Sequence, residues 1–156
     1  MAKQKLDRID KNILRRLQED GRVSNVELAK AVGISAPPCL RRVRLLKDSG
    51  YIQSYHANLD HEKLGYSVSV FSFVSLSNHS EDDLSAFEDY VSDLSMVREC
   101  HLLSGNVDFL LKVVAKDWDD YETFLNQHLL QAPNVESVNS SLCVKPTKAL
   151  PGVPID

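Results

Sequence analysis

The chain has 156 residues, of which 43% are hydrophobic and 26% are charged. This length suits one or two domains, and the composition excludes collagen-like and intrinsically disordered proteins. No stretch approaches the ~20 apolar residues of a membrane-spanning helix, and the first ten residues lack the apolar run of a secretory signal. We therefore expect no membrane partner. The odd number of cysteines, three, favours a reducing cytoplasm over a disulfide framework.

The net charge of −4 conceals two segments of opposite sign. Residues 1–56 contain 12 Lys and Arg against 6 Asp and Glu, whereas residues 57–156 contain 6 against 16. This asymmetry indicates a basic module for a polyanion joined to an acidic module with another task. Scattered surface charge would produce the same balance, so the charge alone does not establish nucleic-acid binding.

Helical periodicity and capping signals predict three helices in the basic segment. The first extends from Asp7 to about Asp20, with apolar residues three or four positions apart. The second starts at a Ser-x-x-Glu capping box, Ser24 with Glu27, and ends at Gly33. A third helix follows at once, and two helices joined by a short turn that contains glycine are typical of a helix-turn-helix.

The third helix has the features of a DNA recognition helix. Ser35 is its expected N-cap, and Pro37 and Pro38 occupy its first turn, where their missing N–H groups cost nothing. At 100° per residue its apolar residues share one face, and they are Cys39, Leu40, Val43 and Leu46. Arg41 and Arg44 point away from this face, and Arg42 lies on its flank. Arginine offers a rigid fork to guanine and to phosphate oxygens, although basic residues on a helix are more often simply solvated.

Residues 51–57 alternate in polarity and are expected to pair with Asn58–Leu59 as a short two-stranded wing. A polar linker, residues 58–64, then leads to a second module. Strand and helix signals alternate there in the order β-α-β-β-α-β, with strands at residues 66–76, 97–103, 108–115 and 135–144 and helices at 81–94 and 117–130. This order is the ferredoxin-like pattern.

The two helices of a ferredoxin-like sheet leave its other face uncovered. Phe71, Phe73 and Leu110 are expected on that face, and self-association is the common way to cover it. A symmetric dimer would also present two recognition helices to two DNA half-sites.

The motifs of common enzymes are missing from the sequence. It contains no phosphate-binding glycine loop, no GxSxG elbow, no CxxC and no HxxxH. We therefore expect neither an enzyme nor a metal site, no cofactor, and a packing role for Cys39, Cys100 and Cys143.

The loop between the second and third strands is a candidate ligand site. Gly105 would let backbone N–H groups hold a carboxylate, and Asp108 could hold an ammonium, which together suit an α-amino acid. An ordinary hairpin turn, with glycine for conformation and aspartate for a side-chain turn bond, explains the same residues.

Several segments resemble the leucine-responsive regulatory protein/AsnC (Lrp/AsnC) family of transcription regulators. They are LDRIDKNILRRLQEDGR, SNVELAKAVGIS, PCLRRVRLLKDSGYI and ECHLLSGNVDFLLKV, and the resemblance extends from Leu6 to about Lys148. It implies an α+β protein with a winged helix-turn-helix at residues 1–57, the linker at 58–64, a ferredoxin-like effector-binding and oligomerisation domain at 65–147, and a tail at 148–156. It also implies a cytoplasmic, nucleoid-associated regulator whose dimers assemble into tetramers or octamers.

The resemblance implies two sets of functional residues. The DNA-binding set is Asn25, Ser35, Pro37, Pro38, Arg41, Arg42 and Arg44. The effector-binding set, for leucine or a related amino acid held between dimers, is Leu103, Ser104, Gly105, Asn106, Val107, Asp108, Ser141 and Leu142. The alternative is an architectural protein that binds double-stranded DNA without an effector.

Overall fold

The computed structural model describes residues 5–150 and 152–156. The chain forms two compact units, Met1–Asn58 together with Lys148–Asp156, and Leu59–Thr147. Residues 1–4 of the expected first domain and residue 151 of the expected tail lie outside the described residues. The segment expected as a linker contains a helical turn, in which the Gly65 N–H donates to the Glu62 carbonyl at 2.9 Å.

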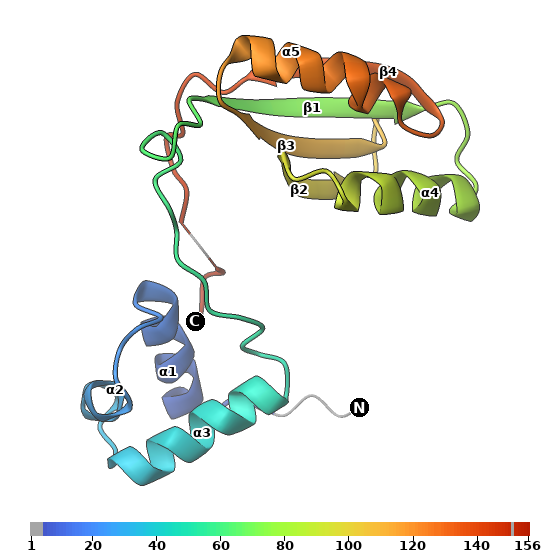
Figure 1. Cartoon of the computed structure of the whole chain (residues 1–156). Coiled ribbons are helices and arrows are strands. Elements are labelled where there is room, and N and C mark those ends of the chain that lie inside the picture. Colours follow the sequence, from blue (N-terminus) through green and yellow to red (C-terminus); the bar gives the residue numbers. More distant parts are fainter. Residues whose placement is uncertain (1–4, 151) are drawn as a thin grey trace. The chain divides into compact units, whose positions relative to one another are not determined.

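The first unit contains the three expected helices, α1 (Arg8–Glu19), α2 (Asn25–Val32) and α3 (Ala36–Asp48) (Figure 1). The Ser24–Glu27 capping box is confirmed, and Gly33 ends α2 with a left-handed φ of 75°. Leu28 and Ala29 of α2 pack between the other two helices. The buried core of this unit consists of Ile13, Leu28, Ala29, Cys39 and Leu46.

Two expectations for this unit were wrong. Residues 51–60 form no strand, so the two-stranded pairing expected at 51–59 is absent from the described chain. Ile52 packs on the helical core and the Tyr55 ring lies against Gly21, where a Cβ would come within 3.3 Å of the ring. These contacts hold the segment along the helices, with no second strand beside it. Leu40, expected in the core, is 40% exposed.

The second unit contains one four-stranded sheet and two long helices. Its elements in chain order are β1 (Val68–Leu76), α4 (Glu81–Ser92), β2 (Val97–Leu102), β3 (Phe109–Ala115), α5 (Trp118–Gln127), the 3₁₀ turn η1 (Leu129–Gln131) and β4 (Val135–Leu142). The strands lie in the order β2-β3-β1-β4 and every neighbouring pair is antiparallel. The ferredoxin-like prediction is confirmed.

The two faces of the sheet differ. Helices α4 and α5 cover one face, where Phe87 of α4 and Tyr121 of α5 pack with the alternating buried residues of β1 and β3. Ser72 on this face is fully buried and bonds the Tyr121 hydroxyl at 2.9 Å, which satisfies both polar groups. Phe71, Phe73, Leu110 and Val114 point to the opposite face and remain only partly buried.

The cysteines differ in environment, contrary to the common packing role expected for them. Cys39 is buried and Cys143 is half-buried, whereas Cys100 is exposed. The exposure of Cys100 follows from its place on β2, an edge strand of the sheet.

Candidate functional site

The exposed arginines of α3 form the candidate nucleic-acid interface. Arg41 and Arg44 are exposed, and neither makes a hydrogen bond or ion pair with the part of the chain that the structure describes. Ser35 is the N-cap residue of α3, but its hydroxyl makes no capping bond. Pro37 beside it is exposed and Pro38 is half-buried. The N-cap of α3 therefore presents a free hydroxyl to solvent, and the helix itself presents two unpaired positive charges.

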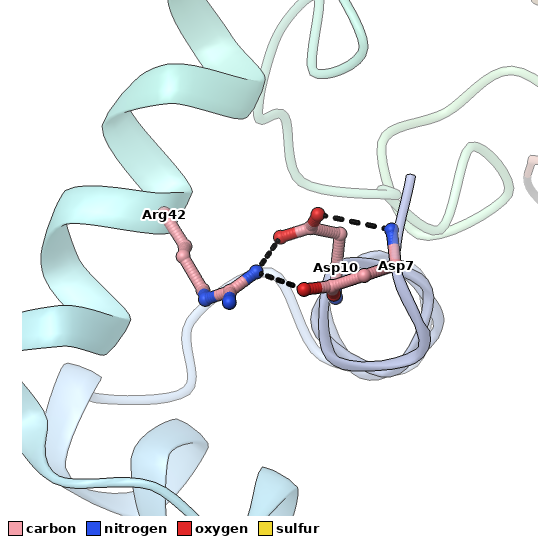
Figure 2. A network of polar contacts seen from close by, with 3 residues as sticks. All are labelled: Asp7, Asp10 and Arg42. Carbon is pink, nitrogen blue, oxygen red and sulfur yellow. Dashed lines mark hydrogen bonds and ion pairs between the residues drawn. The ribbon is translucent and has the colours of Figure 1, made fainter. Parts of the chain in front are cut away.

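Arg42 differs from these two arginines, because its guanidinium is bonded to α1. Figure 2 shows the side chain extending from α3 towards Asp7 and Asp10, with Nη1 at 2.7 Å from each carboxylate. The Arg42 side chain is 28% exposed and that of Asp10 only 10%. We call Asp7, Asp10 and Arg42 the α1–α3 clamp.

The clamp is built on a second capping box, which the sequence analysis did not identify. The Asp7 carboxylate accepts from the Asp10 N–H at 2.8 Å, and the Asp10 carboxylate accepts from the Asp7 N–H at 3.2 Å. The Asp10 N–H, together with the Arg42 guanidinium, holds the pKa of Asp7 below its ordinary value. The Asp10 and Asp7 carboxylates in turn raise the pKa of Arg42. Asp7 and Arg42 therefore each favour the charged form of the other.

Asn25, the first residue of α2, also acts within the fold. Its Nδ2 donates to the Ala36 carbonyl at 2.8 Å, which joins the start of α2 to the start of α3. Its Oδ1 is buried without a partner among the described residues. Of the predicted DNA-binding residues, Asn25 and Arg42 thus brace the helices, while Ser35, Pro37, Arg41 and Arg44 face solvent.

The candidate effector loop connects β2 to β3. Residues 104–106 are exposed, and no backbone N–H of residues 104–107 makes a hydrogen bond in the described chain. The loop is closed at its base by the Leu103 N–H, which donates to the Asp108 carbonyl at 2.7 Å. Gly105 does not have a positive φ, and open space surrounds the position of its absent Cβ. Gly105 therefore leaves the loop backbone accessible to a ligand, and it is not needed for a left-handed conformation.

Asp108 points at the end of β1, which a local hairpin-turn role would not require. Its Oδ2 accepts from the Leu76 N–H at 2.8 Å, beside the register shift between Ser75 and Leu76. The Nε2 of His79 lies 3.1 Å from the same carboxylate. Sequence reasoning missed His79, and its place in the short loop between β1 and α4 is the only signal that could have suggested it.

Ser141 and Leu142 do not lie at the effector loop of the same chain. They pair with Phe71 and Val70, whereas Asp108 bonds Leu76, five or six residues further along β1. At the usual rise of a strand this separation is roughly 17–20 Å. A single site that includes both sets would need a second copy of the chain.

The described residues contain no cluster of three or more His, Cys, Asp or Glu side chains placed to hold a metal ion. None of their helices combines the length and apolar character needed to cross a bilayer.

Comparison with known families matches the two parts of the chain to two different models. Residues 6–53 match a winged helix-turn-helix DNA-binding model, and residues 69–153 match the Lrp/AsnC ligand binding domain. The chain belongs to the Lrp/AsnC family. It is 45% identical over 143 residues to the leucine-responsive regulatory protein of Rhizobium meliloti, covering 92% of both chains. It is 43% identical to that of Escherichia coli K12, covering 92% of this chain and 87% of the relative. The protein is therefore a transcription regulator and not an enzyme.

Solved structures of this Lrp/AsnC type have the same fold over nearly the whole chain. A transcriptional regulator of Neisseria meningitidis, crystallised with L-Met, has a TM-score of 0.93 at 34% identity and is matched over 97% of this chain and 98% of its own. An AsnC family regulator of Agrobacterium tumefaciens has a TM-score of 0.89 at 35% identity, with 96% and 97% covered.

The α1–α3 clamp predicts a specific loss of stability. Replacing Arg42 with Ala leaves the mostly buried Asp10 carboxylate without its cation, which should lower the free energy of unfolding of the helix-turn-helix unit by about 1–3 kcal/mol. Arg16→Ala is the matched control, because it removes only an exposed pair with Glu19 and should cost less than about 0.5 kcal/mol. Urea unfolding of both variants measures the difference. Equal losses would contradict the clamp.

The clamp also predicts acid sensitivity. A carboxylate whose pKa is lowered by folding stabilises the fold above its unfolded pKa of about 4 and loses that contribution as the pH falls through the folded value. The pKa values of Asp7 and Glu27 are both lowered in this unit. Thermal melts should therefore show a loss of stability below about pH 4 that is smaller in Asp7→Asn. An identical pH profile in that variant would exclude Asp7 as a contributor.

Proposed function

We propose that the protein is a sequence-specific DNA-binding transcription regulator whose action responds to an amino acid, leucine or a related one. The proposal of DNA binding rests on the different environments of the three arginines in α3. Arg42 is bonded to α1, and this fixes the helix that presents Arg41 and Arg44 unpaired to solvent. A rigid helix with free guanidinium groups suits the major groove of double-stranded DNA.

The residues of α3 have different roles in this proposal. Arg41 and Arg44 contact base edges or phosphates, and the exposed Ser35 and Pro37 approach the DNA backbone at the helix start. Arg42 positions α3 and makes no DNA contact. Asn25 supports the same geometry from α2 through its bond to the Ala36 carbonyl.

The effector site of this proposal is the loop at residues 104–108. Its unpaired N–H groups would hold the carboxylate of the amino acid, and the Asp108 carboxylate would hold the ammonium. The crystallisation of the N. meningitidis regulator with L-Met supports an amino acid as the ligand class. Ser141 and Leu142 would join the site only from another copy.

Self-association completes the proposal. The open face of the sheet exposes Phe71, Phe73, Leu110 and Val114 in a central patch, with the Lys112–Glu99 ion pair beside it. A second copy would cover this patch symmetrically, and the resulting dimers would assemble into tetramers or octamers. A regulator of this kind acts in the cytoplasm, on the nucleoid.

An effector-independent architectural DNA-binding protein remains the alternative function. It would bind unrelated duplexes with similar affinity, whereas a specific regulator prefers its own site by roughly 10³-fold or more. A duplex selected from a random pool by the full chain, compared with a shuffled duplex of equal composition, separates the two.

The roles of the arginines predict distinct salt dependences. Arg41→Ala and Arg44→Ala should each weaken binding to the selected duplex, and a lost phosphate contact should reduce the slope of log K against log salt by about 0.9. Arg42→Ala should weaken binding with an unchanged slope, because its charge does not face DNA. Fluorescence anisotropy between 50 and about 200 mM salt covers the useful range. A reduced slope in Arg42→Ala alone would refute this assignment.

The effector loop predicts a charge requirement at Asp108. Asp108→Asn keeps an acceptor for the Leu76 N–H but removes the negative charge for the ammonium, so calorimetric titration with L-leucine or L-methionine should show affinity about tenfold weaker or worse. Asp119→Asn, an exposed carboxylate of α5, is the control and should bind as the parent chain does. Unchanged binding in Asp108→Asn, at an unchanged melting temperature, would place the effector elsewhere.

A further inference from the structure

The last residues of the chain return to the helix-turn-helix unit. Residues Lys148–Asp156 cluster with Met1–Asn58 and not with the sheet that precedes them in the sequence (Figure 1). Gln18 of α1 bonds both backbone groups of Val153, since its Nε2 donates to the carbonyl and its Oε1 accepts from the N–H, each at 2.9 Å. Arg15 Nη2 donates to the Ile155 carbonyl at 2.8 Å. We call residues 148–156 the tail.

The spacing on α1 matches the spacing of the tail. Arg15 and Gln18 lie three residues apart and therefore share one face of the helix. Val153 and Ile155 lie two residues apart, and both of their carbonyls accept hydrogen bonds from this face of α1. The Gln18 amide pairs with the tail as a neighbouring strand would, through one donor and one acceptor. This contact recognises the backbone of the tail and not its side chains.

Gly152 makes the close approach possible. Its φ is 79°, a left-handed conformation that favours glycine, and a Cβ at this position would clash with the Gln18 Oε1. Gly152 thus meets both a conformational and a steric requirement of the contact.

We propose that the Arg15–Gln18 face of α1 is a docking surface for the tail of the same chain, and that the docked tail connects the helix-turn-helix unit to the sheet a second time. The first connection enters β1 at Val68 and the second leaves β4 after Leu142. These strand ends are neighbours, because Val70 pairs with Leu142 and the Cys143 N–H donates to the Ser69 carbonyl at 2.8 Å. Both connections therefore leave the sheet at the same end, from adjacent strands.

A contact of three exposed hydrogen bonds is weak between separate molecules but sufficient here. The tail is covalently attached, which gives it a high effective concentration at α1. Pro154 limits the conformations of the free tail and so reduces the entropy lost on docking. The docked state is therefore favoured and still reversible.

Hydrogen exchange of the full chain, measured by mass spectrometry, tests the docking. The Val153 N–H should exchange about tenfold or more slowly than in a free peptide of the same sequence. Gln18→Ala and Gly152→Ala should each abolish this protection, whereas the control Val153→Ala, which changes only a 66% exposed side chain, should keep it. Exchange of the parent tail at the free-peptide rate, or protection that survives both variants, would overturn the proposal.

A mixture of the two variants identifies which copy provides the surface. Gln18→Ala chains have an intact tail, and Gly152→Ala chains have an intact α1. If each tail docks on its own chain, co-refolded mixtures regain no protection. Recovery of protection in the mixture would mean that the tail crosses to a second copy, which overturns docking within one chain. The readout contains neither DNA nor amino acid, so its failure is separate from failure of the proposed function.

Discussion

Arg42 lies between two arginines that face solvent, yet its own guanidinium is bonded to two carboxylates of α1. Among the described residues of the helix-turn-helix unit, five form the buried core and further apolar side chains around it are only partly buried. So small a core leaves a helix orientation weakly determined. The charged, directional contact between α1 and α3 fixes the orientation of α3, which apolar packing alone would leave weakly determined. The exposure of Arg41 and Arg44, and with it the proposed DNA interface, depends on this contact.

The same helix α1 also receives the tail through Arg15 and Gln18, so one helix fixes both the recognition helix and the end of the chain.

The second unit follows a different constraint, which is a sheet covered on one side only. Burial of β1 and β3 under α4 and α5 fixes the strand register, and the register in turn places the effector loop at one end of the sheet and Ser141 and Leu142 nearer the other. The uncovered face makes association with another copy the natural completion of the fold. Under the proposed function, ligand binding and assembly would be thermodynamically linked, since the residues proposed for one effector site would meet only across copies.

Local signals in the sequence predicted most of the fold. The capping box at Ser24, the helix end at Gly33 and the alternation along residues 66–76 depend on near neighbours. The structure confirms each, with the strand beginning at Val68. Contacts between distant residues were not predictable in this way. The sequence does not distinguish Arg42 from Arg41 and Arg44, because its partner Asp10 lies 32 positions away. The contact between Gln18 and Val153 joins residues 135 positions apart and was likewise not predictable. Asp108 suggested a local turn, but its partner Leu76 belongs to another strand. Only the two-stranded pairing expected at residues 51–59 is contradicted, because alternation indicates an extended segment without showing that a second strand will lie beside it.

If DNA binding and amino-acid binding are coupled in one chain, the two equilibria must be linked. The affinity of the full chain for its selected duplex should change at least about fivefold on saturation with L-leucine or L-methionine, and the duplex should change the affinity for that amino acid by the same factor. Anisotropy measures the change in DNA affinity, and calorimetry on the same preparation measures the change in amino-acid affinity. Equal affinity for DNA with and without each of the twenty amino acids would show that the two binding events are not coupled. No preference for the selected duplex over the shuffled one would in addition exclude sequence-specific binding.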